Sequence, residues 1–344
     1  MAGMHVLILY NQPVLDPTHP DAESEHAVVH TVECVEKHLI EGDLRVSKLG
    51  VQRDPAALIR GLRRARPDVV FNLFEGLADQ GDTEAHAAGL LEWLGIPYTG
   101  CPFQTLCLAR TKHVAKRLLQ GAGLPTPDFF VAEEEPEDCP LAFPVIVKPA
   151  AQDASIGVDQ GSVVTDQRQL RERVAELLNR YGPPVLVEEF IRGREFNVGL
   201  IEAPDLQVLP LGEIVFTDPD PNFWPIVTYD AKWKPETRDY KVTPPQYPTL
   251  VARRLAERVD DLARKAFRLL GCRDYARVDF RVRGSRPYIL EVNPNPDISP
   301  MAGLCNDLEA AGLSPARFMT EIVQAAAARG LKGCRDRARV EVKR

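Results

Sequence analysis

Short apolar runs and longer amphipathic segments alternate over the first hundred residues. Three runs have the length and residue types of buried strands: residues 5–10, 44–49 and 68–74. Three further segments carry apolar residues at helical spacing: residues 24–40, 54–65 and 83–95. Asp54 followed by Pro55 is typical of a helix start, and Gly95 is typical of a helix end. This order predicts a parallel sheet with crossover helices.

Beyond residue 102 the pattern changes, and strand patterns occur in two groups. A helical segment that starts near Thr111 is stopped by glycines and Pro125. Strand patterns cover residues 143–150, 185–191, 195–202, 207–216, 275–282 and 287–293. Helical patterns cover most of residues 163–182, 247–271 and about 314–329. We expect domains at residues 1–102, 103–186 and 187–334, with a basic tail at 335–344.

Composition and charge exclude several classes of protein. Of the 344 residues, 44% are hydrophobic and 26% are charged, as in ordinary soluble domains, and the net charge is −7. This balance, with no basic stripe, predicts no nucleic-acid partner. No apolar run approaches the ~20 residues of a membrane span, and the first run is too short for a signal sequence, so we expect a cytoplasmic protein. The seven cysteines form no CxxC pair, which indicates reduced thiols rather than disulfides or zinc ligands.

Two strands near residue 285 form the most informative pattern. In the first strand, alternation puts three polar residues on one face: Arg277, Asp279 and Arg281. In the second strand it puts Glu291 and Asn293 on one face, and the apolar face carries Tyr288, Leu290 and Val292.

If the two strands pair as a hairpin, Asp279, Glu291 and Asn293 converge on one face. Hard oxygen donors with few other ligands nearby are how proteins hold Mg²⁺, which keeps several waters and takes other ligands from substrate phosphates. The alternative is the solvent-facing polar side of an edge hairpin.

Three further features are compatible with a nucleotide site, although each has a simpler reading. Lys148 ends an apolar strand, where it could meet a phosphate or could extend to the surface. The loop 153–158 offers small residues and main-chain N–H groups that could hold phosphate oxygens, as many surface loops do. The segment 185–196 combines acidic residues with Phe190 and Ile191, which suits a purine pocket or a solvated strand end.

Taken together and in order, these segments resemble the ATP-grasp superfamily, and within it the D-alanine–D-alanine ligases. The resemblance covers nearly the whole chain. It is carried by "AESEHAVV", "LLEWLGIPYTG", "TKHVAKRLLQGAGLPTP", "FPVIVKPA", "DASIGV", "VLVEEFIRGREF", "YDAKWKPETRDYKVTPP", "ARVDF" and "YILEVNPNPDIS". It implies a three-domain α/β ATP-grasp fold with an N-terminal Rossmann-like domain.

The resemblance also implies a reaction, in which a carboxylate attacks the γ-phosphate of ATP and an amine then attacks the acyl phosphate. The implied ligands of Mg²⁺, or of Mn²⁺ in its place, are Asp279, Glu291 and Asn293. The implied nucleotide-binding residues are Lys112, Lys148, Glu188, Phe190, Ile191, Glu195 and Lys232. The implied catalytic residues are Glu23, which would bind the first ammonium group, Ser155, which would help to fix Glu23, and Arg277, which would stabilise developing negative charge. Residues 217–248 match a loop that closes over ATP and excludes water.

The chain departs from the family pattern where the family binds amino acids. Asp153 replaces the first glycine of the family's "GSSVG" loop, Trp233 replaces a tyrosine, and Glu75 stands at a histidine position. The stretch "EVNPNPDIS" replaces the usual "EANTSPGMT". The leading hypothesis is therefore a ligase of two small amino acids, with D-alanine as the default and a homodimer as the family's frequent state. The alternatives are a ligase of a specialised pathway with other substrates, and an ATP-binding module without catalysis.

Overall fold

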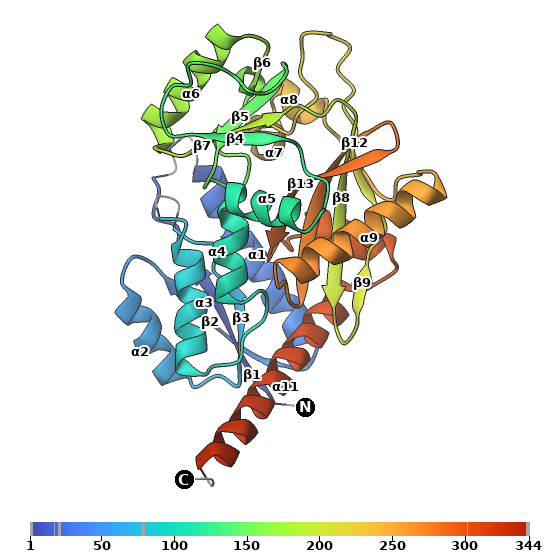
Figure 1. The fold of residues 1–344 in the computed structure, drawn as a ribbon. Helices are drawn as coiled ribbons and strands as arrows, with labels where there is room; N and C mark the ends of the chain where they lie inside the picture. Colours follow the sequence, from blue (N-terminus) through green and yellow to red (C-terminus); the bar gives the residue numbers. More distant parts are fainter. Residues whose placement is uncertain (1–2, 17, 20–21, 78–79, 301, 342–344) are drawn as a thin grey trace.

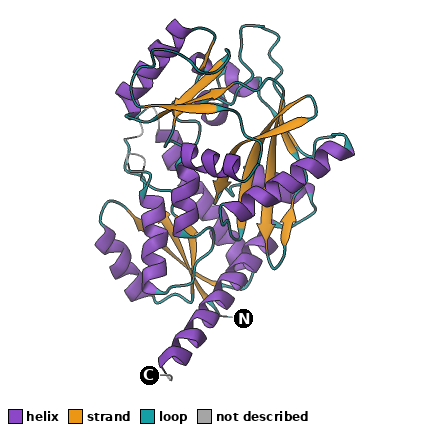
Figure 2. Cartoon of the chain, viewed as in Figure 1, coloured by secondary structure: helices purple, strands orange, loops and turns teal. Residues whose placement is uncertain are grey.

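Three separate sheets, each with its own helices, make up the structure (Figures 1 and 2). It is a computed structural model, and it describes the chain except residues 1–2, 17, 20–21, 78–79, 301 and 342–344 and the side chains of residues 331–341. The three sheets contain three, four and six strands.

The first sheet is parallel, as the alternating pattern predicted, and its strand order is β2-β1-β3. Its strands are β1 (His5–Asn11), β2 (Arg45–Val51) and β3 (Val69–Leu73). Its helices are α1 (Ala22–Glu41), α2 (Pro55–Ala65) and α3 (Thr83–Leu94). The Asp54 carboxylate accepts a hydrogen bond from Ala56 N–H at 2.9 Å, so α2 begins with the predicted cap. Gly95 ends α3 in the left-handed conformation, with φ of 68°.

The second sheet is antiparallel and has the order β4-β7-β5-β6. Its strands are β4 (Phe129–Ala132), β5 (Val145–Pro149), β6 (Val163–Val164) and β7 (Val185–Glu189). The helix α6 (Gln167–Tyr181) packs on it through Leu170, Val174 and Leu177. Two helices, α4 (Phe103–Arg110) and α5 (Lys112–Gly121), lead into this sheet, whereas the sequence predicted one.

The third sheet has the order β11-β10-β8-β12-β13, with β9 paired to β8. Its strands are β8 (Arg194–Glu202), β9 (Leu206–Val208), β10 (Gly212–Ile214), β11 (Pro245–Gln246), β12 (Tyr275–Arg283) and β13 (Arg286–Pro294). The strand expected at 207–216 is split in two, since Pro210 has no N–H to continue the ladder. The helix α9 (Arg253–Leu269) crosses one face of the sheet (Figure 1).

The C-terminal helices return to the first sheet. α10 (Gly303–Ala310) and α11 (Pro315–Glu341) share a core with α1, β1 and β3, and in this core Phe318 and Ile322 lie with Ile8 and Phe71. α11 is longer than the helix that we expected at 314–329. Residues 330–341, which form its extension, include three arginines and two glycines but no proline, so no proline stops the helix there.

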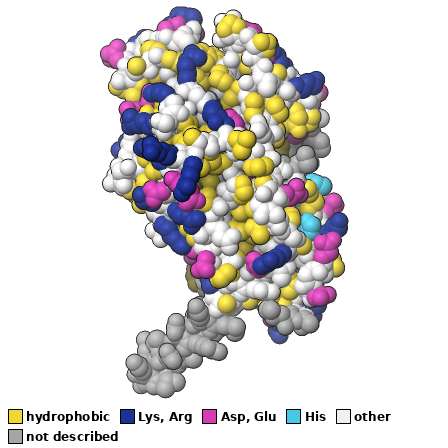
Figure 3. Space-filling view, turned by 90° about the vertical axis from the view of Figure 1, so that its right-hand side faces the viewer, with side chains coloured by type: hydrophobic (Ala, Val, Ile, Leu, Met, Phe, Trp, Pro, Cys, Tyr) yellow, Lys and Arg dark blue, Asp and Glu magenta, His cyan; other side chains and the backbone are white. Residues whose placement is uncertain are grey.

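Charged side chains of both signs are interspersed on the face shown in Figure 3. Exposed helix α9 carries three ion pairs at a spacing of four residues: Arg253–Glu257, Arg264–Asp260 and Lys265–Asp261. Such exposed pairs contribute little to the free energy of unfolding, on the order of 0.3–0.5 kcal/mol each.

Candidate active site

A cleft of about 740 Å³ lies between the second and third sheets, which is the size of a pocket for a nucleotide-sized ligand. It is lined by twelve of the thirteen predicted site residues: Lys112, Lys148, Ser155, Glu188, Phe190, Ile191, Glu195, Lys232, Arg277, Asp279, Glu291 and Asn293. The remaining one, Glu23, is exposed in the first turn of α1 and does not line the cleft.

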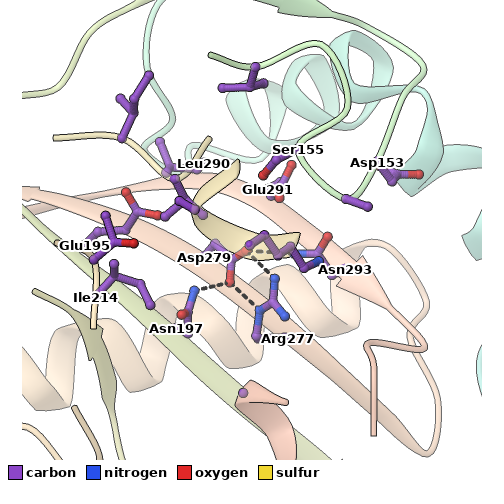
Figure 4. A pocket seen from close by; sticks show the side chains of 18 of the residues that line it. Asp153, Ser155, Glu195, Asn197, Ile214, Arg277, Asp279, Leu290, Glu291 and Asn293 are labelled. Carbon is purple, nitrogen blue, oxygen red and sulfur yellow. Dashed lines mark hydrogen bonds and ion pairs between the residues drawn. The ribbon is translucent and has the colours of Figure 1, made fainter. Parts of the chain in front are cut away.

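Asp279 of β12 is the centre of the polar floor of this cleft (Figure 4). Arg277 donates two hydrogen bonds to its carboxylate, Nε to Oδ1 at 2.7 Å and one terminal nitrogen to Oδ2 at 2.8 Å. Asn197 of β8 donates to Oδ1 at 2.8 Å, and Asn293 of β13 donates to Oδ2 at 2.9 Å. Burial opposes ionisation, but Arg277 and these donors lower the pKa of Asp279 below its usual value, so the carboxylate is charged.

Asn197 is a site residue that the sequence did not reveal to us. β8 pairs with β12 so that Asn197 lies opposite Asp279. The sequence did contain a signal, because Asn197 is the one polar side chain within the stretch 196–201 of this central strand.

The oxygen atoms on this floor fit a divalent cation. Asp279 and Glu291 are directly opposite in the antiparallel pair β12–β13, so their side chains lie on one face. Asn293 uses its amide nitrogen for Asp279, so its Oδ1 is the atom left for a ligand. Two carboxylates and an amide oxygen are a donor set that Mg²⁺ accepts when water and phosphate complete its shell. The described residues contain no group of three or more His, Cys, Asp or Glu side chains able to hold a metal.

A β-bulge in this hairpin corrects one sequence-based expectation. Asp279 pairs with Glu291 but Phe280 pairs with Ile289, so Leu290 is an extra residue without a partner. We expected Leu290 on the apolar face of the strand, but it lines the cleft next to Glu291, while Ile289 enters the core. The bulge thus adds an apolar side chain to the cleft beside the acidic one.

The carboxylate of Glu188 forms ion pairs with two lysine side chains. Its carboxylate lies 2.5 Å from Lys116 Nζ and 2.6 Å from Lys148 Nζ, and Glu188 is 1% exposed. Burial would raise the pKa of Glu188, but the two ammonium groups lower it to about 2. Lys116, which the sequence did not single out, lies one helical turn after Lys112 on α5. The triad therefore fixes Lys148 at the end of β5, where it lines the cleft.

Lys112 contacts the loop in which Asp153 replaces a glycine of the family pattern. Its ammonium group forms an ion pair with Asp153, donates to the carbonyl of Gln152 at 2.7 Å and lies 3.9 Å from Glu291. The other oxygen of Asp153 lies 3.2 Å from Arg110. Burial acts against ionisation, but Lys112 and Arg110 lower the pKa of Asp153, so a negative charge lies among the cations of the cleft.

The apolar end of the cleft has the parts of a base-binding pocket. Phe190 and Ile191 follow β7 and line the cleft, and the ring of Phe190 meets the edge of Trp224 with centroids 5.4 Å apart. Glu195 at the start of β8 lies 2.7 Å from Arg281. Burial nevertheless raises the pKa of Glu195 above its usual value.

The segment 217–248 is folded over the cleft and contains α7 (Tyr229–Trp233) and α8 (Arg238–Lys241). The Trp233 indole N–H donates to the carbonyl of Ala154 at 3.0 Å. Lys232 lines the cleft and stacks over the Trp233 ring at 5.0 Å. Burial and the nearby Arg277 lower the pKa of Lys232.

The fold and the residues around this cleft define a protein of the ATP-grasp class. A family model described as "D-ala D-ala ligase C-terminus" matches residues 118–324. The chain is 35% identical to the D-alanine–D-alanine ligase of Desulforudis audaxviator over 82% of this chain and 87% of that one. It is 33% identical to an uncharacterised protein, y4sG, of Sinorhizobium fredii over 86% and 85% of the two chains.

Among solved structures, the D-alanine–D-alanine ligase of Bacillus anthracis complexed with ATP matches with a TM-score of 0.76. That match is 20% identical and covers 96% of this chain and 99% of the other. The chain belongs to the D-alanine–D-alanine ligase family. None of the helices in the described part of the chain has the length and apolar character needed to span a membrane.

Proposed function

We propose that this protein is an ATP-dependent ligase that joins two small amino acids through an acyl phosphate. The observation that carries the proposal is the floor of the cleft, where Asp279, Glu291 and Asn293 present oxygen atoms beside Arg277. A cluster of oxygen donors next to an arginine suits phosphoryl transfer, in which positioning and charge neutralisation do most of the work. The relatives named D-alanine–D-alanine ligase support the same reaction class.

The two ends of the cleft suit the two ends of ATP. Phe190, Ile191 and Leu290 would contact the base, and Glu195 would accept hydrogen bonds from ribose hydroxyls. Lys148 and Lys112 would meet the phosphates, each already positioned by a carboxylate partner. Asp279, Glu291 and Asn293 would hold Mg²⁺ or Mn²⁺. When bound, the cation would neutralise the negative charge of the phosphates.

Arg277 and Lys232 would stabilise the reacting groups. The guanidinium group of Arg277 is held by Asp279 and lines the cleft, so it can donate to the acyl phosphate oxygens and to the tetrahedral oxygen that forms when the amine attacks. Lys232 reaches the cleft from α7, within the segment that would close it. Closure would exclude water, which would otherwise hydrolyse the acyl phosphate.

We propose that each sheet is the centre of one domain, at residues 1–102, 103–186 and 187–334. Strand β7 continues to Glu189 and so crosses the second boundary, and α11 continues into the basic tail at 335–344. We place the enzyme in the cytoplasm, because all six cysteines with described side chains are free thiols. The homodimer stays a prediction from the family resemblance.

D-alanine is the default substrate, but three features favour a second candidate, a ligase with other amino-acid substrates. Asp153 brings a carboxylate into the phosphate loop, Glu75 lies where the family has histidine, and Trp233 cannot accept a hydrogen bond as the family's tyrosine does.

Release of ADP from MgATP, measured with D-alanine and then with amino acids of both hands singly and in pairs, tests the proposal. We expect turnover that depends on an amino acid. ATP binding without amino-acid-dependent ADP release across the whole panel would instead support a non-catalytic nucleotide-binding module.

A further inference from the structure

A small recess opens next to the large cleft, between the first sheet and the loop after β13. Its volume is about 10 Å³, which is room for one water molecule or one ammonium group but not for a side chain. It is lined by Thr31, Asn72, Leu73, Phe74, Glu75, Glu84, Tyr275, Asn295, Pro296, Asp297 and Ile298. Asp297 lines both the recess and the large cleft, so the two are adjoining.

Three carboxylates surround this recess, and two of them belong to the N-terminal part of the chain. The carboxylates of Glu75 and Glu84 make no hydrogen bond or ion pair with any described residue, whereas that of Asp297 accepts hydrogen bonds from Ser299 at 2.8 and 3.0 Å. Glu75 is exposed to solvent, yet desolvation by the surrounding protein and the nearby Asp297 raise its pKa to about 7. Glu75 and Asp297 are both within electrostatic range of Lys232. The recess is therefore acidic on the side that adjoins the cations of the cleft.

A separate observation indicates that a bound cation alone would leave one polar group of the recess without a hydrogen-bond partner. Asn72 is 2% exposed and lines the recess, and its Oδ1 accepts the main-chain N–H of Phe74 at 3.3 Å. Its Nδ2 has no hydrogen-bond partner among the described residues. A buried donor without a partner is costly, so the occupant should offer an acceptor as well as a positive charge. A metal ion supplies only the charge, whereas a zwitterionic α-amino acid supplies both.

We infer that Glu75 and Asp297 together bind the ammonium group of the amino acid whose carboxylate is activated, and so decide substrate choice at this site. The carboxylate of that amino acid points toward Lys232 and Arg277, which line the adjoining cleft. The ammonium group lies at the mouth of the recess between the carboxylates of Glu75 and Asp297, and Asn72 donates to the substrate carboxylate through the one water for which the recess has room. This inference rests on the proposed ligase function and gives the ammonium contact to residues other than Glu23.

The position of Glu23 supports this assignment. Glu23 is exposed and lines neither the recess nor the cleft. Glu75 lies two residues after β3, at the carboxyl end of a parallel strand, where α/β sheets place their ligands. Asp297 comes from the "EVNPNPDIS" stretch, which differs from the family pattern. Two departures from the family thus meet at one recess.

The test uses the full-length chain and the amino acid that gives the highest ADP release in a panel of both hands. KM for that amino acid, kcat and the Kd of a non-hydrolysable ATP analogue are measured for wild type and for Glu75→Gln, Asp297→Asn and Glu23→Gln. The hydroxy acid that replaces the ammonium group of the same substrate by hydroxyl is measured in parallel. Glu172→Gln, an exposed acid on α6, serves as the control for loss of one negative charge. Circular dichroism confirms that each variant is folded.

We expect Glu75→Gln and Asp297→Asn each to raise KM for the amino acid roughly tenfold or more, because each loses a charge-assisted hydrogen bond. The Kd of the ATP analogue should stay unchanged, and the preference for the amino acid over its hydroxy analogue should fall by a similar factor. An unchanged KM in either folded variant, or a larger rise in KM for Glu23→Gln than for Glu75→Gln, overturns the inference and leaves the ligase function standing. Wild-type protein that binds ATP but releases no ADP with any amino acid overturns both.

Discussion

The indole N–H of Trp233 donates a hydrogen bond of 3.0 Å to the main-chain carbonyl of Ala154. This bond joins α7, in the segment that covers the cleft, to the loop 153–158 on the opposite wall. Ala154 and Ser155 are both non-glycine residues with positive φ, 56° and 61°, a conformation that side chains disfavour. Contacts from both sides hold this loop, Trp233 on one side and the Asp153 ion pairs on the other. On the proposed function, closure over ATP would use this donor to the main chain in place of the tyrosine of the family pattern.

Trp233→Phe should weaken ATP binding by roughly twofold to tenfold, since it removes one neutral hydrogen bond of about 0.5–1.5 kcal/mol and keeps most of the ring. The rate of proteolytic cleavage within residues 217–248 should rise as well. Titration of a non-hydrolysable ATP analogue and limited proteolysis measure the two effects. Trp93→Phe is the matched control, because Trp93 is 85% exposed on α3. Equal behaviour of the two variants would show that the indole N–H has no role in closure.

Asp153→Asn should tighten ATP binding by roughly threefold to tenfold. The change removes a negative charge that lies against Lys112 and Arg110, and both cations then become more available to phosphate. Calorimetric titration with the ATP analogue at two salt concentrations measures the affinity, and the gain should shrink at high salt. Weaker binding would mean that Asp153 serves mainly to position Lys112.

Asp279→Asn and Glu291→Gln should each lower ATP turnover by about 10²-fold or more. Each change removes a charged oxygen atom that, on the proposed function, binds the cation and so positions the phosphates. The thermal unfolding midpoint of Glu291→Gln should change little, since Glu291 is partly exposed. Asp261→Asn on the exposed face of α9 is the control. Wild-type turnover should stop with a chelator and return with Mg²⁺ or Mn²⁺. Near-normal turnover in both variants would disprove the metal assignment.

Glu188→Gln should lower the free energy of unfolding by about 3–5 kcal/mol, because it leaves Lys116 and Lys148 buried without a counter-charge. Since the pKa of Glu188 is lowered to about 2, its contribution is complete above the ordinary glutamate pKa near 4.5. The contribution is lost as the pH falls from there toward 2. Urea unfolding at pH 7 measures the loss, and Glu172→Gln should stay within about 0.5 kcal/mol of wild type.

The increase in the free energy of unfolding that Asp307→Asn produces should grow as the pH rises. Asp307 is fully buried, accepts the Gly199 N–H at 2.9 Å, and has an Oδ1 without a partner among the described residues. Burial raises its pKa to about 8, so the wild-type protein loses stability between the ordinary aspartate pKa near 4 and pH 8. Asparagine keeps the acceptor and carries no charge. The difference in the free energy of unfolding between variant and wild type should grow by on the order of 1–3 kcal/mol over this range; a difference that is constant with pH would contradict it.

The alternation of the hairpin strands predicted correctly that Asp279, Glu291 and Asn293 share one polar face. Asp279 and Glu291 do lie opposite each other, because period-two alternation survives up to the bulge. The parallel first sheet was also predictable, since its strands are short, apolar and separated by capped helices. These features are local, and local patterns are what a single sequence records.

Other site features depend on contacts between distant segments and could not be predicted in this way. The bulge that turns Leu290 into the cleft adds one residue to one strand, and nothing in the alternation marks where. Lys116 becomes part of the site only because Glu188, 72 positions later in the chain, is buried against it. The partner of Trp233 is a main-chain carbonyl, and a carbonyl has no side-chain signature.

The packing of α11 against α1, β1 and β3 has a consequence for synthesis on the ribosome. One apolar face of the first sheet, which includes Ile8 and Phe71, is completed by Phe318 and Ile322. During translation this face stays without its cover until almost the whole chain has been made, and exposed apolar surface of this kind favours aggregation. The N-terminal unit should therefore depend on chaperones, or on temporary partners, for most of its time as a nascent chain.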